Sequence, residues 1–205
     1  QAHLEDYIAC LTRIWGPALS EAGYEVVRTP IKVYTASVQT GCGKLSKVNA
    51  TYCGADQRIY FSMDLPRTFP KAVQDQPFGI ESVIAHEFGH SIQARTGILV
   101  SSYALSQDVK EKVELEMSRR IEVQADCFAT AAMSSIGYSQ NMSDADRANV
   151  NALFYSIGDD VLTGNPTVVG NHGHGKSRQA WAETGFRGGP LQACNSFTAP
   201  ESKVR

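Results

Sequence analysis

The sequence predicts an α+β fold that is mainly helical, with a small β-sheet near the N-terminus. Three observations support this prediction. Apolar residues recur with helical spacing over residues 3–22, 78–95 and 107–136, which is typical of amphipathic helices. Short runs of β-branched and aromatic residues between positions 24 and 62 predict strands. No repeat, linker or low-complexity tract interrupts residues 1–205, so we expect a single domain.

The composition narrows the classes of partner. Of the 205 residues 42% are hydrophobic, and the formal net charge is -2 with acidic and basic residues interspersed. This balance gives no reason to expect nucleic acid or an anionic membrane as a partner. No apolar run approaches the roughly 20 residues that span a bilayer, so we expect no membrane span in this chain. The first residue is Gln1 rather than Met, which suggests a mature or trimmed product.

The first 78 residues are expected to hold one helix and the sheet. The helix over 3–22 ends at Gly23, a residue that suits a helix C-terminus. Three short segments are predicted to be strands: 24–27, 31–34 and 58–62. Residues 35–49 are polar and contain glycine, so we predict a loop there. Three prolines over 64–78 predict a wrapped loop that leads into the next helix.

The rest of the chain is expected to be helical. The helix over 78–95 has an apolar face formed by Ile80, Ile84, Phe88 and Ile92. The longest periodic segment, 107–136, is predicted to follow the N-cap Ser106 and to end at Gly137. Two more helices are expected, over 144–157 and, within a glycine-rich tail, over 179–184.

The helix over 78–95 carries two histidines and a glutamate in the pattern H-E-x-x-H. His86 and His90 lie four residues apart, so both imidazoles can bind one metal ion from one helix face. Glu87 lies about 100° further round the helix, outside the ligand set but close to a metal-bound water. We therefore expect Glu87 to be a general base.

A catalytic zinc site needs a third protein ligand. Gln93 and Thr96 occupy the positions of the metzincin glycine and histidine, which excludes that class. The long predicted helix offers two carboxylates one helical turn apart, Glu122 and Asp126. We assign Glu122 as the third metal ligand. We expect Asp126 to accept a hydrogen bond from a ligating histidine and so fix its orientation. The alternative is a solvated helix face. Both carboxylates, however, border the apolar stripe in a section poor in charge, since residues 123–136 contain no charged residue besides Asp126, so each carboxylate needs a partner.

The five cysteines lack the C-x-x-C spacing of a structural zinc site and stand at positions 10, 42, 53, 127 and 194. A bridge between Cys42 and Cys53 would close a short polar loop. Disulfides of this kind indicate an extracytoplasmic compartment. The alternative is that all five are reduced thiols packed as small hydrophobes.

The motifs together are more specific than H-E-x-x-H alone. The pattern His86-Glu87-Phe88-Gly89-His90 is followed by Glu122-Val123-Gln124-Ala125-Asp126-Cys127-Phe128-Ala129. Further matching positions are Gly158-Asp159-Asp160, His172-Gly173, Arg178, Trp181, Gly185-Phe186 and Cys194-Asn195-Ser196-Phe197, with Trp15, Cys42-Gly43, Tyr52-Cys53 and Ile59-Tyr60 upstream. On these residues, which cover most of the chain, the sequence resembles the bacterial family of putative neutral zinc metallopeptidases.

The resemblance implies a zincin-like fold, in which the H-E-x-x-H helix packs against the long helix that carries E-x-x-x-D. It implies a gluzincin-like site with one Zn²⁺ ion, and its ligands would be His86, His90 and Glu122. It also implies two disulfides, Cys42 with Cys53 and Cys127 with Cys194, which leaves Cys10 over.

Peptide hydrolysis also needs a donor to the oxyanion that develops on the attacked carbonyl. A histidine on a glycine-flanked loop is suitable, and the resemblance to the family's His-Gly motif implies that this histidine is His172. The sequence departs from the family at His174, where a small hydroxyl residue is usual, so the roles of the two histidines stay open. Tyr155 and Arg178 are further candidates for the oxyanion contact. The alternative is that both histidines are exposed loop residues or a chance surface metal site.

We therefore expect zinc-dependent hydrolysis of a peptide or protein substrate, in which Glu87 takes a proton from water and returns it to the leaving amine. The predicted strand at 58–62 is expected to pair with an extended substrate. The alternative is a catalytically silent, zinc-stabilised binding or assembly protein on a peptidase scaffold. We expect a secreted protein or the ectodomain of a membrane-anchored precursor.

Overall fold

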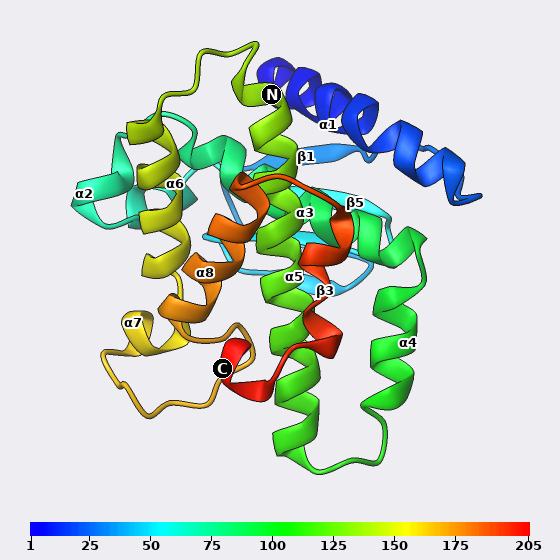
Figure 1. The fold of residues 1–205 in the computed structure, drawn as a ribbon. Helices are drawn as coiled ribbons and strands as arrows, with labels where there is room; N and C mark the ends of the chain where they lie inside the picture. The colour runs from blue at the N-terminus through cyan, green and yellow to red at the C-terminus, as the bar shows by residue number, and fades with distance from the viewer.

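The computed structural model describes residues 1–205 and confirms a mainly helical α+β fold with a small sheet near the N-terminus (Figure 1). The long helix α5 (Glu111–Gly137) lies between α3 (Gly79–Arg95) and α8 (Gly175–Phe186). The sheet packs against α3, and α1 (Ala2–Glu21) contacts both α3 and α5. Helix α3 therefore has the sheet on one side and α5 on the other.

The sheet has three strands in the spatial order β1 (Ile31–Tyr34), β5 (Arg58–Ser62), β4 (Ala50–Cys53). Strand β5 pairs parallel with β1 and antiparallel with β4. Because β5 is central, both of its edges are already paired. The prediction that the strand at 58–62 pairs with a substrate is therefore wrong. The two edge strands of this sheet are β1 and β4.

The sheet differs from the sequence prediction in two further places. Residues 24–27 form no strand, and Tyr24, Val26 and Val27 are exposed because no neighbouring strand pairs with them. The loop predicted over 35–49 is interrupted by an antiparallel hairpin of β2 (Val38–Thr40) and β3 (Gly43–Leu45). Strand β4 was not predicted. These segments are only three or four residues long, so their periodicity is too short to detect.

Three of the predicted helices lie close to their predicted bounds. Helix α1 is followed by Gly23 in a left-handed conformation (φ 83°), α3 spans Gly79–Arg95, and α6 spans Asp144–Ser156. Ser143 and Asp146 form a capping box at the start of α6. The predicted helix at 179–184 is longer, because α8 begins at Gly175 and ends at Phe186.

The predicted start of the long helix is wrong. Ser106 is the C-cap of a short helix, α4 (Ile98–Leu105), which the sequence did not suggest. Asp108 has φ 57°, a left-handed conformation that an α-helix cannot include, and α5 begins three residues later at Glu111. Val109 and Val113, two apolar residues within the predicted helix, are exposed.

The remaining helical elements are short. Two of them lie in the stretch 64–78 that was predicted to be a loop: the 3₁₀ turn η1 (Leu65–Thr68) and α2 (Lys71–Gln74). The others are α7 (Asp159–Thr163) and the 3₁₀ turns η2 (Leu191–Cys194), η3 (Ser196–Thr198) and η4 (Glu201–Lys203). Three of these four belong to the C-terminal tail, which packs against α5 and α8.

Two disulfides hold parts of the fold together. Cys42 is bonded to Cys53, and Cys127 on α5 is bonded to Cys194 in the tail, while Cys10 is a free thiol. The first disulfide ties the end of β4 to the β2–β3 hairpin. None of the helices has both the length and the hydropathy that crossing a bilayer requires.

Two glycines permit close contacts between helices. A Cβ atom on Gly89 of α3 would lie 3.2 Å from the Cα and carbonyl oxygen of Ala125 on α5. A Cβ atom on Gly185 of α8 would overlap with Thr130 Oγ1 and the carbonyl oxygen of Cys127 on α5. Helix α5 is therefore packed directly against backbone on both sides.

We expect Gly185→Ala to lower the free energy of unfolding by about 3 kcal/mol, because the added methyl must displace backbone, and Gly89→Ala to lower it by about 1 kcal/mol. Gly54→Ala, at a position with no atom within 4 Å of the added Cβ, is the matched control and should change little. Urea denaturation of the three variants measures the differences. Equal losses for Gly185→Ala and Gly54→Ala would contradict the proposed close packing.

Candidate metal centre

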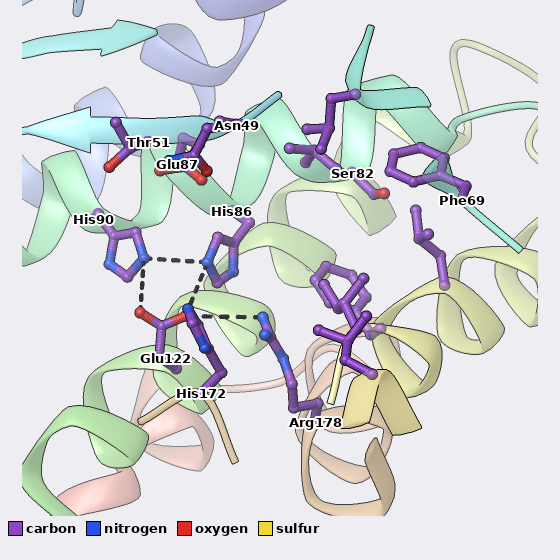
Figure 2. A pocket seen from close by; sticks show the side chains of 17 residues that line it. Asn49, Thr51, Phe69, Ser82, His86, Glu87, His90, Glu122, His172 and Arg178 are labelled. Atoms are coloured by element: carbon purple, nitrogen blue, oxygen red, sulfur yellow. Dashed lines mark hydrogen bonds and ion pairs between the residues drawn. The ribbon is translucent and has the colours of Figure 1, made fainter. Parts of the chain in front are cut away.

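Helices α3 and α5 bring two histidines and a glutamate to one point. One ligand atom each from His86, His90 and Glu122 lies within 4.8 Å of the others. The Nε2 atoms of His86 and His90 are 3.1 Å apart, and the Glu122 carboxylate lies 3.3 Å from His86 Nε2 and 3.5 Å from His90 Nε2 (Figure 2). The three side chains border a cavity of about 360 Å³.

This arrangement fits a zinc ion. Two imidazole nitrogens and a carboxylate face one another at hydrogen-bond distances, and their electron pairs repel unless a proton or a metal cation lies among them. Two histidines and one glutamate, with one side open to a cavity, form a ligand set typical of catalytic zinc. Through the cavity a water or a substrate would have access to a metal held by these three residues.

His86 is held by a buried ion pair. Its Nδ1 lies 2.8 Å from Asp126 Oδ1, and Asp126 accepts two hydrogen bonds from Arg178, from Nε at 2.9 Å and from Nη2 at 2.8 Å. Arg178 Nη2 also lies 3.9 Å from Glu122 Oε2. A carboxylate at Nδ1 fixes the ring and leaves Nε2 for a metal. Arg178, a candidate for the oxyanion contact, is thus engaged with Asp126.

The charges of this group shift several pKa values. Burial alone would lower the pKa of His86, but the hydrogen bonds that its ring donates to Asp126 and Glu122, together with the negative charges of these carboxylates, raise it to about 10. Burial would raise the pKa of both carboxylates, yet the neighbouring histidines and Arg178 hold them below their usual range. At neutral pH a proton therefore occupies the metal-free site, and a metal must displace it.

Glu87 lies beside the ligand set and faces the sheet. Its side chain is buried against β4, where its Oε2 accepts a hydrogen bond of 2.6 Å from the backbone N–H of Tyr52. Glu87 also lines the cavity together with the two histidines. Sequence reasoning missed the Tyr52 contact, and a backbone amide leaves no signal in residue types.

His172 reaches the same cavity from the loop between α7 and α8. Its Nδ1 lies 3.3 Å from Asp159 Oδ1, and the backbone N–H groups of His172 and Gly173 donate to Asp159 Oδ2. Gly173 has φ 89°, a conformation that favours glycine. Asp159 therefore shapes the loop, a role we did not predict although Gly158-Asp159-Asp160 was among the family's motifs.

His174 and Tyr155 do not line the cavity. His174 is the N-cap of α8, its Nε2 lies 2.7 Å from the carbonyl oxygen of Val168, and its Nδ1 lies 3.9 Å from Asp160. The Tyr155 side chain is exposed. Of the two loop histidines, only His172 borders the candidate site.

The cavity has an apolar end away from the ligands. Figure 2 shows Phe69 on the far side of Ser82 from His90. The apolar lining residues are Leu65, Phe69, Val83, Leu153, Phe154, Ile157 and Leu162. One cavity therefore combines a polar cluster with a hydrophobic recess.

Comparisons with known proteins identify a family and several relatives of this chain. The family model described as "Putative neutral zinc metallopeptidase" matches residues 2–197. The chain is 30% identical over 206 residues to the uncharacterized protein Rv2575 of Mycobacterium tuberculosis, covering 92% of this chain and 67% of that protein. It is 30% identical over 190 residues to the uncharacterized protein YpfJ of Escherichia coli, covering 89% and 66%.

The chain thus spans about two thirds of the length of these relatives. No solved structure matches it.

We expect the metal-free protein to lose stability at alkaline pH. His86 has a pKa of about 10 in the folded protein against 6.5 in the unfolded chain, so its contribution is complete below about pH 6.5 and is lost as the pH rises through about 10. The expected fall in the free energy of unfolding is of the order of a few kcal/mol. Asp126 acts in the opposite direction: its lowered pKa stabilises the fold above about pH 4, and this contribution is lost on acidification.

Urea denaturation of chelator-treated protein between about pH 6 and 10 measures the alkaline effect. In His86→Gln the alkaline fall should largely disappear. An equal fall in that variant and in the unchanged protein would contradict the assignment.

Proposed function

The chain belongs to the family of putative neutral zinc metallopeptidases, and we propose on this premise that it hydrolyses peptide bonds with one zinc ion as its cofactor. The observation that carries the proposal is the position of Glu87. Glu87 directly follows His86 in the sequence but is not one of the three residues that could hold a metal. Its side chain borders the same cavity as these three. A site that only stabilises the fold has no use for a carboxylate beside an open coordination position.

His86, His90 and Glu122 would hold the metal. Bound zinc would supply Lewis-acid chemistry, lowering the pKa of a water and stabilising negative charge on a carbonyl oxygen. Glu87 would accept a proton from the attacking water and return it to the leaving amine. His172 would donate to the developing oxyanion, since Asp159 holds its Nδ1 and its Nε2 is left for the cavity.

The free edge of β4 would bind an extended peptide. The backbone carbonyl of Asn49, just before β4, accepts a hydrogen bond from the N–H of Ser62 on β5. Residues of an antiparallel pair alternate between bonded and non-bonded positions, so the odd-numbered residues of β4 direct their backbone groups toward β5. The backbone groups of Ala50 and Tyr52 therefore point away from β5, as the Tyr52 bond to Glu87 illustrates. Ala50 lines the cavity, and its N–H and C=O are suited to pair with a substrate backbone.

The apolar recess would determine the preferred substrate. It lies at one end of the cavity that holds the ligand cluster, so it would receive a side chain next to the bond that is cut. Its lining is aliphatic and aromatic and carries no charge. We therefore propose peptides with a large apolar residue beside the scissile bond.

We also propose an extracytoplasmic location. The two disulfides would persist in an oxidising compartment, whereas cytosolic thiols are kept reduced.

We expect Glu87→Gln to keep zinc but lose at least a hundredfold in turnover, because it removes the base and leaves the ligands. Glu122→Ala should lose most of its zinc. Metal analysis and mass-spectrometric mapping of cut sites in a peptide mixture, with and without a chelator, measure both. Retained hydrolysis in Glu87→Gln would overturn the mechanism, and full zinc occupancy in Glu122→Ala would overturn the ligand set. If zinc-loaded unchanged protein produces no new termini, the chain is a binding protein.

We expect Ala50→Pro to fold and to retain zinc but to lose about tenfold in kcat/KM. Proline removes the outward N–H of Ala50, and proline is tolerated where a strand N–H has no partner strand. Ala50→Val keeps the N–H and is the matched control. Equal kcat/KM values for these two variants would contradict peptide binding at the β4 edge.

A further inference from the structure

His90 has a buried partner that the proposed chemistry does not use. His90 Nδ1 lies 2.8 Å from Gln93 Oε1, one helical turn along α3. The side chain of Gln93 is fully buried, at 0% exposure. A buried amide must find partners for its oxygen and for its nitrogen, so the surroundings of Gln93 decide which atom faces His90.

The surroundings of Gln93 fix its orientation. Gln93 Nε2 donates to the carbonyl oxygen of Ile121 at 2.8 Å, and a carbonyl can only accept. The amide nitrogen must therefore lie on that side, so the amide oxygen faces His90. An oxygen at this position can only accept, which requires His90 to carry its proton on Nδ1 and leaves the Nε2 lone pair for a metal.

A second amide supports the first. Gln93 Nε2 also donates to Gln124 Oε1 at 3.0 Å, and Gln124 Nε2 donates to the carbonyl oxygen of Cys194 at 3.2 Å. Cys194 is held to α5 by its disulfide with Cys127. The direction of each hydrogen bond made by the two amides is fixed, because the carbonyl oxygens of Ile121 and Cys194 can only accept.

We propose that Gln93 and Gln124 form an amide relay that sets the tautomer of His90 and thereby prepares it to bind the metal. Gln93 is a positioning residue, since it acts through His90. The two histidines are then oriented by different chemistry: Asp126 with Arg178 orients His86, and the neutral relay orients His90. The inference rests on the proposed metal site.

The tautomer of His90 is measured by ¹⁵N NMR of the metal-free protein, and zinc affinity is measured by competition with a chelator. In the unchanged protein we expect the His90 proton on Nδ1. Gln93→Met has a similar volume but only a weakly accepting thioether in place of the amide oxygen, so we expect a second population with the proton on Nε2 and a 10- to 100-fold loss of zinc affinity, as is typical when a partner of a metal ligand is removed. Gln124→Met should give a smaller loss in the same direction.

Two variants separate positioning from structural support. Gln93→Glu keeps an acceptor for His90 but cannot donate to Ile121, so it should retain the Nδ1 proton while losing stability. Ser91→Ala removes another buried polar group of α3, one that bonds to its own helix, and should leave both the tautomer and zinc affinity unchanged.

If Gln93→Met binds zinc as tightly as the unchanged protein, or if its His90 keeps the Nδ1 proton, the relay is overturned. If Gln93→Glu loses the tautomer as Gln93→Met does, the acceptor role is also overturned. A failure of the unchanged protein to bind zinc would instead overturn the proposed function.

Discussion

The contact between α3 and α5 at Gly89 and Ala125 is the constraint on which the rest of the site depends. Gly89 lies between the two histidines of α3, and Ala125 lies between the two carboxylates of α5, so the contact is at the centre of the four functional side chains. With no Cβ on Gly89, the helices approach closely enough for carboxylate and imidazole to meet at 3.3 Å. A larger residue would separate the helices and lengthen the distances from the two histidines of α3 to the two carboxylates of α5.

This packing leaves ionisable groups in the interior, and their charges must be balanced there. Removing a carboxylate or a guanidinium from water costs several kcal/mol, and attraction repays this only with good geometry. The two hydrogen bonds from Arg178 to Asp126 provide that geometry. Asp126 is thereby kept ionised next to His86, and Glu122 stays ionised at the ligand cluster. The buried pair thereby fixes the position of the carboxylate that orients His86.

The sequence predicted what depends on local periodicity. The two site helices and the pairing of His86 with His90 on one helix face follow from residues spaced three or four apart, whereas the convergence of Glu122 with them was expected from the resemblance to the metallopeptidase family. The unpaired segment 24–27, the hairpin within 35–49 and the late start of α5 depend on neighbours or on one left-handed residue, Asp108, which periodicity does not detect. The bond between Tyr52 and Glu87 and the bonds from Gln93 to Ile121 and Gln124 were missed because they join residues whose proximity is created only by folding.

The 100° step of the α-helix explains why a histidine and the proposed base are adjacent in sequence. Helix α3 has the sheet on one side and α5 on the other, so consecutive side chains can face different neighbours. His86 faces α5, where Asp126 fixes its ring, and Glu87 faces β4, where the Tyr52 N–H holds its carboxylate. One disulfide is attached to each of these neighbours, at Cys53 on β4 and at Cys127 on α5. The groups that would bind metal and those that would bind peptide are therefore held by separate parts of the fold and meet only at α3.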